Sequence, residues 1–233
     1  MMDDEIERDP MFLPDVVAPT VEFLARLAGD GRALELGIGT GRIALPLATR
    51  GVEVHGIDLS EEAIVTLRAR PGGARIGVTL GDFATVTVGG SFRLAYLVYN
   101  TIMNLTTQEA QVACFRNVAA HLEEGGLFVV ETVVPDLRRL PPGERFVVFD
   151  ARDVHWGVDE YDVVTQGLVS HHFDIDGDQI TGSSGAFRYV WPAELDLMAR
   201  IAGLQLRERW ADWTREPFTS ESRQHVSVWQ KPA

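Results

Sequence analysis

A glycine-rich loop directly after a short apolar segment constrains the fold of this chain more than any other feature. Residues 33–36 read as a buried strand of a parallel sheet, and Gly37, Gly39 and Gly41 follow at alternate positions. Glycine has no Cβ, so the backbone can turn sharply there and approach a ligand closely. A helix is predicted to begin near Arg42, with its free N–H groups directed at the loop. This order predicts a nucleotide-like ligand.

The glycine spacing and a nearby acid narrow the kind of ligand. The dinucleotide fingerprint places its third glycine three positions after the second, where this chain has Arg42. The third glycine comes early, at Gly41, and Glu35 lies two residues before the first. A carboxylate beside the loop repels a pyrophosphate but suits a cationic ammonium or sulfonium group. Taken alone, the loop is also compatible with a tight turn that binds nothing.

Hydrophobic runs and helical periods alternate from about residue 14 to 132, which predicts a parallel α/β sheet. The predicted strands in this part are 33–36, 52–57, 75–80, 93–99 and 127–131. The predicted helices are 15–28, the helix that begins near residue 42, 60–70 and 107–121. Further along, a helix over 192–202 and strands over 204–210 and 225–230 close the chain.

Residues 134–190 do not continue the alternation of strands and helices that precedes them. Three prolines within 135–144 predict a loop, and three strand-like pieces follow, at 145–149, 163–173 and 179–190. The sequence DIDGD at 174–178 has turn chemistry and predicts a hairpin. We therefore expect an antiparallel insertion on the main sheet.

The insertion divides the chain into segments. Residues 12–133 and 191–233 are expected to form one domain, and 134–190 the insertion. Residues 1–11 are acidic and are expected to form a flexible N-terminus.

Charge and cysteine content exclude several classes of protein. The formal net charge of −13 argues against nucleic-acid binding, which needs a basic face. No apolar segment reaches the roughly 18–20 residues of a membrane span, and the N-terminus lacks the apolar part of a signal peptide. The single cysteine, Cys114, is expected mid-helix in the core; it rules out an internal disulfide framework and favours a cytoplasmic location.

Acidic residues mark the ends of three successive strands. Ligands of open parallel sheets bind at the carboxyl ends of the strands, and those ends carry Glu35, Asp58 and Asp82. One carboxylate accepts two hydrogen bonds, so Asp58 is suited to both hydroxyls of a ribose. Asp82 can accept from the exocyclic amine of adenine, and Phe83 can cover a face of the base.

These motifs resemble those of the class I S-adenosylmethionine-dependent methyltransferases. The resemblance rests on four segments in order: ELGIGTG at 35–41, IDLS at 57–60, GDF at 81–83 and LEEGGL at 122–127. It covers about residues 12–133, and the last two strands also fit. It implies an α/β fold with a Rossmann-like, seven-stranded, mostly parallel sheet, helices on both faces and an antiparallel β insertion after strand five.

The resemblance also implies S-adenosyl-L-methionine as the cofactor. Glu35 and the loop would hold its methionine end, and Asp58 its ribose. Asp82 and Phe83 would hold the adenine. The expected cofactor-binding residues are Glu35, Gly37, Gly39, Thr40, Gly41, Asp58, Leu59, Asp82, Phe83 and Tyr99.

A second resemblance concerns the acceptor. The insertion ahead of YVWPAEL at 189–195 is similar to that of sugar N-methyltransferases and glycine N-methyltransferases, where it roofs the substrate pocket or builds a dimer contact. This implies methyl transfer to an amine or hydroxyl of a small metabolite, by a monomer or homodimer. The segment YNTIMN at 99–104 lacks the Pro-Pro-aromatic motif that marks amino methylation of bases or glutamine.

Candidate catalytic residues follow strand four or lie in the insertion. Asn100 either orients the nucleophile or caps the backbone in a turn. His171 and His172 are adjacent in a strand, so their side chains point to opposite faces and at most one can serve the pocket as a general base. His121 ends a helix, where an imidazolium complements the helix dipole.

Three alternatives to this interpretation stay open. Asp58 would also fit a nicotinamide-dependent oxidoreductase, although Arg42 and the Gly81-Asp82 pair argue against one. The chain could also bind the cofactor without transferring a methyl group. A protein acceptor is less favoured, because a covered pocket suits small acceptors. No metal site is predicted: the histidines lack ligand spacing, and the glycine of 174–178 falls at the wrong position for a calcium loop.

Overall fold

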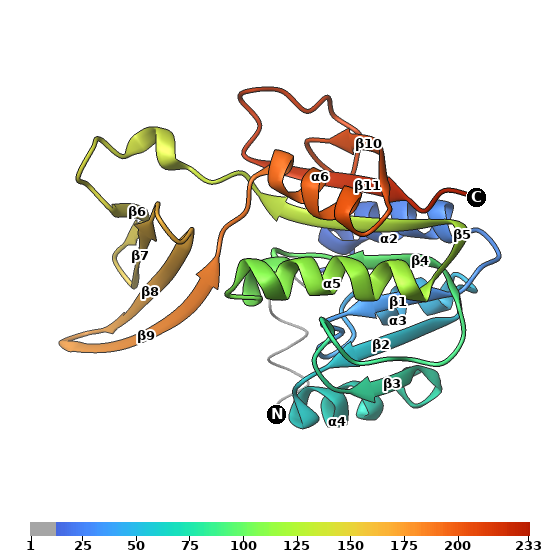
Figure 1. Ribbon diagram of the computed structural model, residues 1–233. Helices are drawn as coiled ribbons and strands as arrows, with labels where there is room; N and C mark the ends of the chain where they lie inside the picture. Colours follow the sequence, from blue (N-terminus) through green and yellow to red (C-terminus); the bar gives the residue numbers. More distant parts are fainter. Residues whose placement is uncertain (1–12) are drawn as a thin grey trace.

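The computed structural model describes residues 13–233 and contains a seven-stranded and a four-stranded sheet, here called the large sheet and the small sheet (Figure 1). The strands of the large sheet are β1 (Ala33–Leu36), β2 (Val54–Asp58), β3 (Gly77–Leu80), β4 (Phe92–Leu97), β5 (Leu122–Val133), β10 (Gln205–Trp210) and β11 (Gln224–Gln230). Those of the small sheet are β6 (Phe146–Arg152), β7 (His155–Asp162), β8 (Gly167–Asp176) and β9 (Gln179–Arg188).

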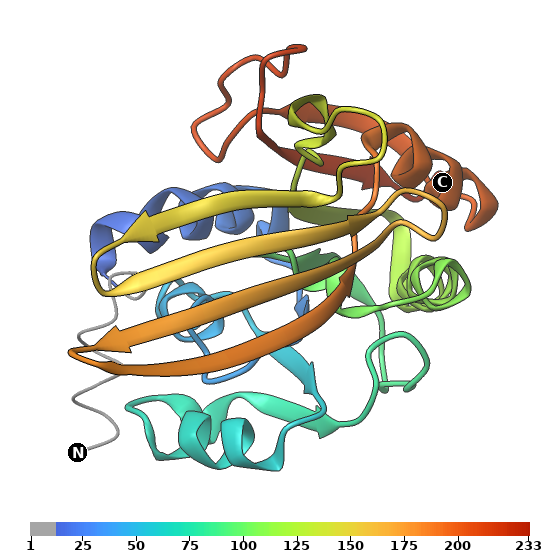
Figure 2. The same cartoon turned by 90° about the vertical axis from the view of Figure 1, so that its left-hand side faces the viewer.

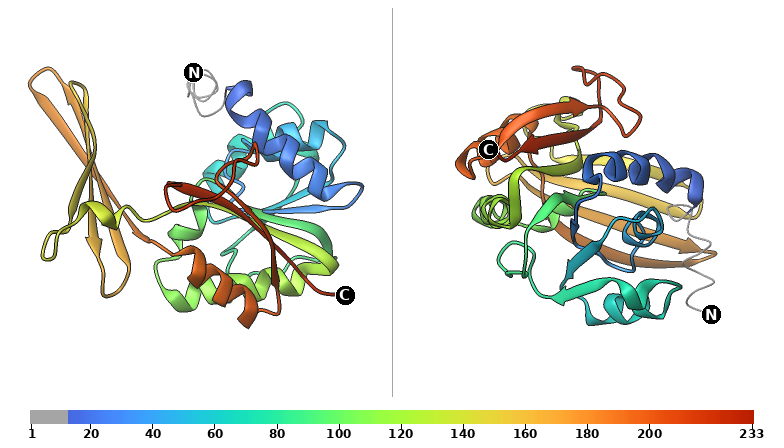
Figure 3. Two further views of the ribbon diagram at one scale, coloured as in Figure 1. Left: turned by 90° about the horizontal axis from the view of Figure 1, so that it is seen from above. Right: turned by 90° about the vertical axis from the view of Figure 1, so that its right-hand side faces the viewer.

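Helices cover both faces of the large sheet (Figures 1 and 3). The helices are α2 (Pro14–Ala28), α3 (Ala44–Thr49), α4 (Glu61–Ala69), α5 (Gln108–His121) and α6 (Pro192–Ile201), with short 3₁₀ turns η2 (Gly73–Arg75), η3 (Thr101–Asn104) and η4 (Leu137–Arg139). Buried residues of α2 and α3 pack in one core layer, and those of α5 and α6 pack in the other.

The large sheet has the strand order β10-β11-β5-β4-β1-β2-β3. Strands β1 to β5 run parallel, and β11 is antiparallel to both of its neighbours. This confirms the seven-stranded, mostly parallel sheet that the family resemblance implies. The strand order reverses beside β1, so the glycine loop lies at the switch point where ligands of such sheets bind.

Local signals set several helix ends as predicted. The Ser60 hydroxyl accepts a hydrogen bond from the Ala63 N–H at 3.1 Å, and Thr107 caps α5 in the same way through Ala110. Cys114 is fully buried in α5 among apolar residues, as expected. Burial raises the pKa of its thiol, so the thiolate that a nucleophile needs is suppressed.

The insertion is an antiparallel sheet, as predicted, and it forms a sheet of its own. It differs from the prediction in two ways. Strand β7 was not predicted. Residues 163–166 were predicted as strand but form a turn, because the Asp162 carboxylate accepts from the Val164 N–H and the Thr165 hydroxyl while Gln166 is left-handed at φ 59°. The hairpin at 174–178 is confirmed between β8 and β9.

The small sheet stands across the carboxyl ends of the large sheet's strands (Figures 1 and 2). One face, the inner face, carries Asp159 and Tyr161, which line a cavity with Val133 and Val134 at the end of β5. The opposite face, the outer face, carries four apolar side chains that are 52–64% exposed: Phe146, Val148, Trp156 and Ile180. The inner face therefore lies toward the large sheet, whereas the outer face is exposed to solvent.

Two negative findings apply to residues 13–233. No helix in this part is long and apolar enough to cross a membrane. No cluster of histidine, cysteine and acidic side chains there has an arrangement that could hold a metal ion. The expectation for residues 1–11 lies outside the described residues, as does residue 12 of the expected first domain segment.

Candidate active site

The glycine loop has the backbone that only glycine adopts freely. Gly37, Gly39 and Gly41 all have positive φ, at 73°, 53° and 83°. The N–H groups of Gly37 and Ile38 both donate to the Ile57 carbonyl and tie the loop to β2. A Cβ at Gly37 would lie 2.7 Å from a methyl group of Thr101, whereas the space beside Gly39 is open. Thus the loop is fixed at its base and open at its tip, where a ligand can approach.

Asp58, at the end of β2, is joined to the loop by a hydrogen bond. One carboxylate oxygen accepts from the Gly39 N–H at 2.6 Å, and the other accepts from the Ser60 N–H at 2.9 Å. Each oxygen keeps a lone pair that a ribose hydroxyl could use. Beside it, Leu59 is 68% exposed. An apolar side chain in this position offers a surface on which a flat base can pack.

The segment after β3 fits its expectation only in part. The Asp82 carboxylate accepts from the Ala84 N–H at 2.8 Å and leaves its other oxygen available. Phe83 is buried in the core, and the Asn117 amide holds its backbone carbonyl from α5. Because the Phe83 side chain is buried in the core with residues of α5, it has little surface left for a base, and the structure does not support the expectation that it covers the adenine.

Glu35 is a buried acid at the start of the loop. It is 2% exposed, and the Tyr96 hydroxyl donates to it at 2.9 Å. Burial raises its pKa to about 8, against the lowering effects of the Tyr96 hydrogen bond, the Arg42 charge and the N–H of Ala44 at the start of α3. The carboxyl therefore holds its proton at neutral pH. A cation bound nearby would favour the ionised form, which fits the predicted ammonium or sulfonium ligand.

A strained turn follows β4. Tyr99 and Asn100 are consecutive non-glycine residues with φ of 55° and 60°. Such conformations cost on the order of 1–3 kcal/mol each and gather at functional sites. The Asn100 side-chain oxygen accepts from the Val133 N–H at 2.8 Å, and the Glu131 carboxylate accepts from the Tyr99 N–H at 2.8 Å. Asn100 was expected either to orient the nucleophile or to cap the backbone in a turn, and the structure shows it capping the backbone.

A cavity of about 270 Å³ lies beside this turn. Tyr99, Asn100 and Glu131 line it at the ends of β4 and β5. Arg42 also lines it, with its guanidinium 5.0 Å from the centre of the Tyr99 ring. Tyr99 is 57% exposed, so its ring lies at the surface where the loop, α2 and the strand ends meet. The cavity lies beside the glycine loop, and its lining combines these polar side chains with apolar ones such as Val16, Ile43 and Trp213.

The two adjacent histidines point to opposite faces of the small sheet, as predicted. His171 lies on the outer face, where its ring contacts the Ser184 hydroxyl at 2.8 Å and the Glu160 carboxylate at 3.6 Å. His171 therefore does not face the pocket, and it is not placed to act there as a general base. His172 lies on the inner face, where its Nδ1 is 3.1 Å from the Nε2 of His155. Only His172 of the two is directed at the strand ends.

His121 is structural, but its charge differs from the expectation. Its Nε2 accepts from the Val88 N–H at 2.8 Å, and its Nδ1 lies 2.7 Å from the Asn117 carbonyl. A ring nitrogen that accepts a hydrogen bond carries no proton, so this imidazole is neutral. The predicted imidazolium at the helix end is therefore wrong, because the loop before β4 uses the lone pair.

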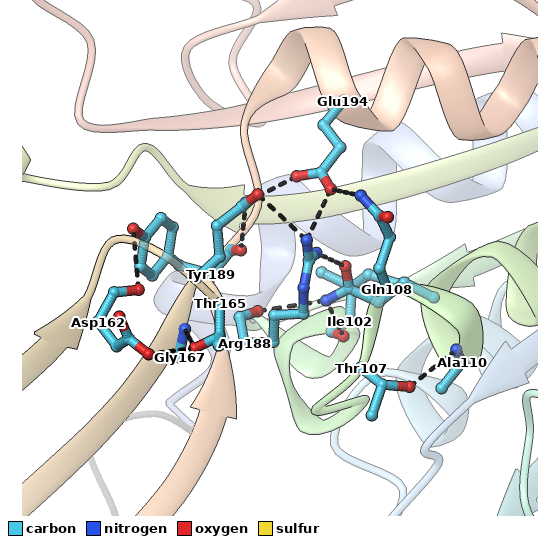
Figure 4. Close-up of polar contacts among 12 residues, drawn as sticks. Ile102, Thr107, Gln108, Ala110, Asp162, Thr165, Gly167, Arg188, Tyr189 and Glu194 are labelled. Atoms are coloured by element: carbon cyan, nitrogen blue, oxygen red, sulfur yellow. Dashed lines mark hydrogen bonds and ion pairs between the residues drawn. The ribbon is translucent and has the colours of Figure 1, made fainter.

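A buried ion pair anchors the insertion (Figure 4). Arg188 at the end of β9 pairs with Glu194 of α6 at 2.7 Å, and their side chains are 5% and 14% exposed. Gln108 and Gln166 donate to the same carboxylate, each at 2.7 Å. Gln111 of α5 accepts from Arg188 and donates to the Ile102 carbonyl in η3. This junction was not predicted, since its members come from four elements that no sequence spacing relates.

Comparison with known proteins shows which family this chain belongs to. Residues 33–126 match the family model described as a methyltransferase domain. The chain is similar to the CcbJ methyltransferase from Streptomyces caelestis, with 38% identity and a TM-score of 0.86 over 99% of this chain and 96% of that one. It is also 30% identical to the cypemycin N-terminal methyltransferase of Streptomyces sp over 215 residues, 87% of this chain and 84% of the relative.

A more distant structure extends the fold similarity. CalS10 from Micromonospora echinaspora, an amino pentose methyltransferase, is 20% identical with a TM-score of 0.72 over 99% of this chain and 95% of its own. The chain belongs to the S-adenosylmethionine-dependent methyltransferases. Its cofactor is S-adenosylmethionine. None of these relatives supports the oxidoreductase alternative.

Proposed function

We propose that this enzyme methylates an amine of a small metabolite, with a hydroxyl as the second candidate acceptor. The observation that carries the proposal is the cavity at the ends of β4 and β5, walled by the strained Tyr99–Asn100 turn, with the small sheet standing opposite. The names of several relatives favour an amine: cypemycin N-terminal, sugar N- and glycopeptide N-methyltransferases. A ubiquinone biosynthesis O-methyltransferase, 28% identical, favours the hydroxyl.

The mechanism rests on alignment. When bound, S-adenosylmethionine supplies a sulfonium methyl group that is already a good electrophile. Glu35 and the loop hold the methionine end, while Asp58 and Leu59 hold the nucleoside. The rigid turn at Tyr99 and Asn100 then fixes the acceptor relative to that donor site. Orientation of this kind can supply about 7–11 kcal/mol of barrier reduction.

The insertion, residues 134–190, serves in this proposal as the roof of the acceptor pocket. Support comes from its inner face, which lies opposite the strand ends, and from the cavity that Asp159 and Tyr161 share with Val133. The remaining described residues form the cofactor-binding domain. A net charge of −13 supports a small acceptor over nucleic acid. The lone buried Cys114 supports a cytoplasmic location.

Titration calorimetry and labelled-methyl transfer test the proposal. We expect the purified enzyme to bind S-adenosylmethionine, and Asp58→Ala to weaken binding by about tenfold or more, because the ribose hydroxyls lose a charged acceptor. Asp58→Asn keeps an oxygen for the Gly39 N–H and serves as the control for loop geometry. Methyl transfer is then measured to an aminosugar, a short peptide with a free N-terminus and a catechol. Label on the catechol alone would favour the hydroxyl; no label on any compound would reject the proposal.

A further inference from the structure

A row of polar side chains crosses the inner face of the small sheet. The Nδ1 of His155 lies 2.8 Å from the Asp150 carboxylate, and its Nε2 lies 3.1 Å from the Nδ1 of His172. The Nε2 of His172 lies 3.3 Å from the Ser170 hydroxyl. Ser170 pairs across the strands with Asp159, so the two side chains share this face. We call these five residues the relay row.

An irregularity in β6 turns Asp150 toward the row. The pairing of β6 with β7 shifts register between Val148 and Asp150, so that Asp150 stands opposite Gly157. A one-residue shift exchanges the faces of a strand. Without it, Asp150 would share the outer face with Val148. With it, the carboxylate meets His155 on the inner face.

With both imidazole rings neutral, the hydrogen bonds allow one arrangement of the protons. Arg152 and His155 both donate to Asp150, which lowers the pKa of this carboxyl and keeps it ionised. His155 must then carry its proton on Nδ1, which leaves Nε2 to accept from the Nδ1–H of His172. The Nε2 of His172 is thereby left without a proton and accepts from the Ser170 hydroxyl. Ser170 has a single hydroxyl proton, so it donates to Asp159 while that carboxyl is ionised and to His172 once Asp159 holds a proton.

The other end of the row lies at a cavity. Asp159 lines a cavity of about 430 Å³ with Tyr161 of the same sheet and with Val133 and Val134 after β5. The other charged side chains that line it are Asp136, Arg138, Glu221 and Arg223. Burial raises the pKa of Asp159, while the Ser170 and Tyr161 hydroxyls and the two nearby histidines counteract this rise. The surroundings of Asp159 therefore favour its protonated form more than water does.

We propose that the relay row carries the acceptor's proton away from the active site, from Asp159 through Ser170, His172 and His155 to Asp150. The proposal rests on the proposed function, because each methyl transfer to a neutral amine or hydroxyl releases one proton. The nitrogen or oxygen lone pair forms the new bond to carbon as the carbon–sulfur bond breaks, and its electron pair goes to sulfur. The acceptor's proton goes to Asp159, and one proton moves along each hydrogen bond of the row.

The proton leaves at the edge of the sheet. Asp150 is 19% exposed in its side chain and lies in the edge strand β6, so water reaches the far end of the row. Because Arg152 favours the ionised form of this carboxyl, Asp150 passes the proton that it receives from His155 on to water. The cavity of Asp159 and the acceptor cavity beside Tyr99 share Val133 in their linings, so in this scheme the acceptor reaches Asp159 across Val133. The other four residues restore Asp159 after each turnover.

Imidazole NMR tests the row without cofactor or acceptor. Nitrogen-15 shifts report which ring nitrogen carries the proton. We expect the Nδ1 tautomer for both His155 and His172 in the wild type. Asp150→Ala should move both rings toward the Nε2 tautomer, while Asp153→Ala in the adjacent turn leaves them unchanged. A His172 that carries its proton on Nε2 in the wild type overturns the proposal.

Kinetics test the row with S-adenosylmethionine and whichever compound of the panel the wild type methylates. We expect His172→Asn and Asp159→Asn to lower kcat about tenfold or more, with KM for S-adenosylmethionine unchanged. The matched controls are His171→Asn and Glu160→Gln, neighbours on the outer face, which should keep the wild-type kcat. Equal losses in the controls, or no loss in the relay variants, overturn the proposal. A wild type that methylates nothing rejects the proposed function instead, and the NMR result still decides on the row.

Discussion

Glu35 couples the cofactor site to pH. Its pKa, raised from 4.5 to about 8 by burial, means that the folded chain keeps a proton that the unfolded chain releases. Between these two values the contribution of Glu35 to the free energy of unfolding falls as pH rises, by at most about 4–5 kcal/mol at 1.36 kcal/mol per unit. Below pH 4.5 both states hold the proton and the contribution is fully present.

The pH dependence is therefore a testable property of this one carboxyl. We expect urea denaturation to show that the wild type loses stability from pH 5 to pH 8 relative to Glu35→Gln, which cannot release a proton. Saturating S-adenosylmethionine should reduce the difference, because its ammonium group pairs with the ionised acid. Parallel stability curves for the two proteins would show that Glu35 titrates normally.

Strand-end acids could be predicted from sequence because their positions depend only on where a strand stops. Glu35, Asp58 and Asp82 all lie where the glycine loop and strand ends require. Phe83 and Asn100 could not be assigned in this way. Packing against α5 decides the direction of Phe83, and the Val133 N–H decides the role of Asn100. Both depend on elements distant in sequence.

At the scale of elements, the junction between β9, α5 and α6 predicts a specific weakness. Removing one partner of a buried ion pair leaves the other charge uncompensated, at a cost of about 3–5 kcal/mol. We expect Arg188→Met to lower the free energy of unfolding by this amount. Hydrogen exchange should rise in β6–β9, while the core strand β1 stays protected.

The comparison with a double variant isolates the charge effect. Arg188→Met combined with Glu194→Leu removes both charges, so it should be less destabilising than Arg188→Met alone. If the double variant is the less stable of the two, the glutamine contacts and not the ion pair hold the junction. Arg26→Met, in an exposed pair with Glu22, is the control and should have little effect.

The elements of the large sheet were predictable because strands and helices there alternate with strong apolar periods. The small sheet was harder to predict. Strand β7 carries three acids and a glycine, HWGVDEYD, and these residues hide the alternation of apolar and polar positions. The register shift that turns Asp150 inward leaves no trace in residue spacing. For that reason the sequence offered single histidines as candidates but predicted neither the contact between His172 and His155 nor the role of Asp150.

At the scale of the whole molecule, the outer face of the small sheet predicts an assembly. We propose that Phe146, Val148, Trp156 and Ile180 pack against the same face of a second copy, which selects the homodimer from the two states considered. Light scattering should give the dimer mass for the wild type and the monomer mass for Trp156→Glu. A control, Val164→Glu, changes an exposed residue of the β7–β8 turn. A monomeric wild type would contradict this assignment.

The separation of the small sheet from the large one has a consequence for how acceptor preference can change. Residues 134–190 leave the large sheet after β5 and return before α6, and no strand of the small sheet pairs with the donor domain. Hairpins can therefore lengthen, and inner-face side chains can be replaced, without altering the loop or the strand-end acids. The architecture therefore allows the acceptor specificity to change in the small sheet while the cofactor-binding residues of the large sheet stay the same.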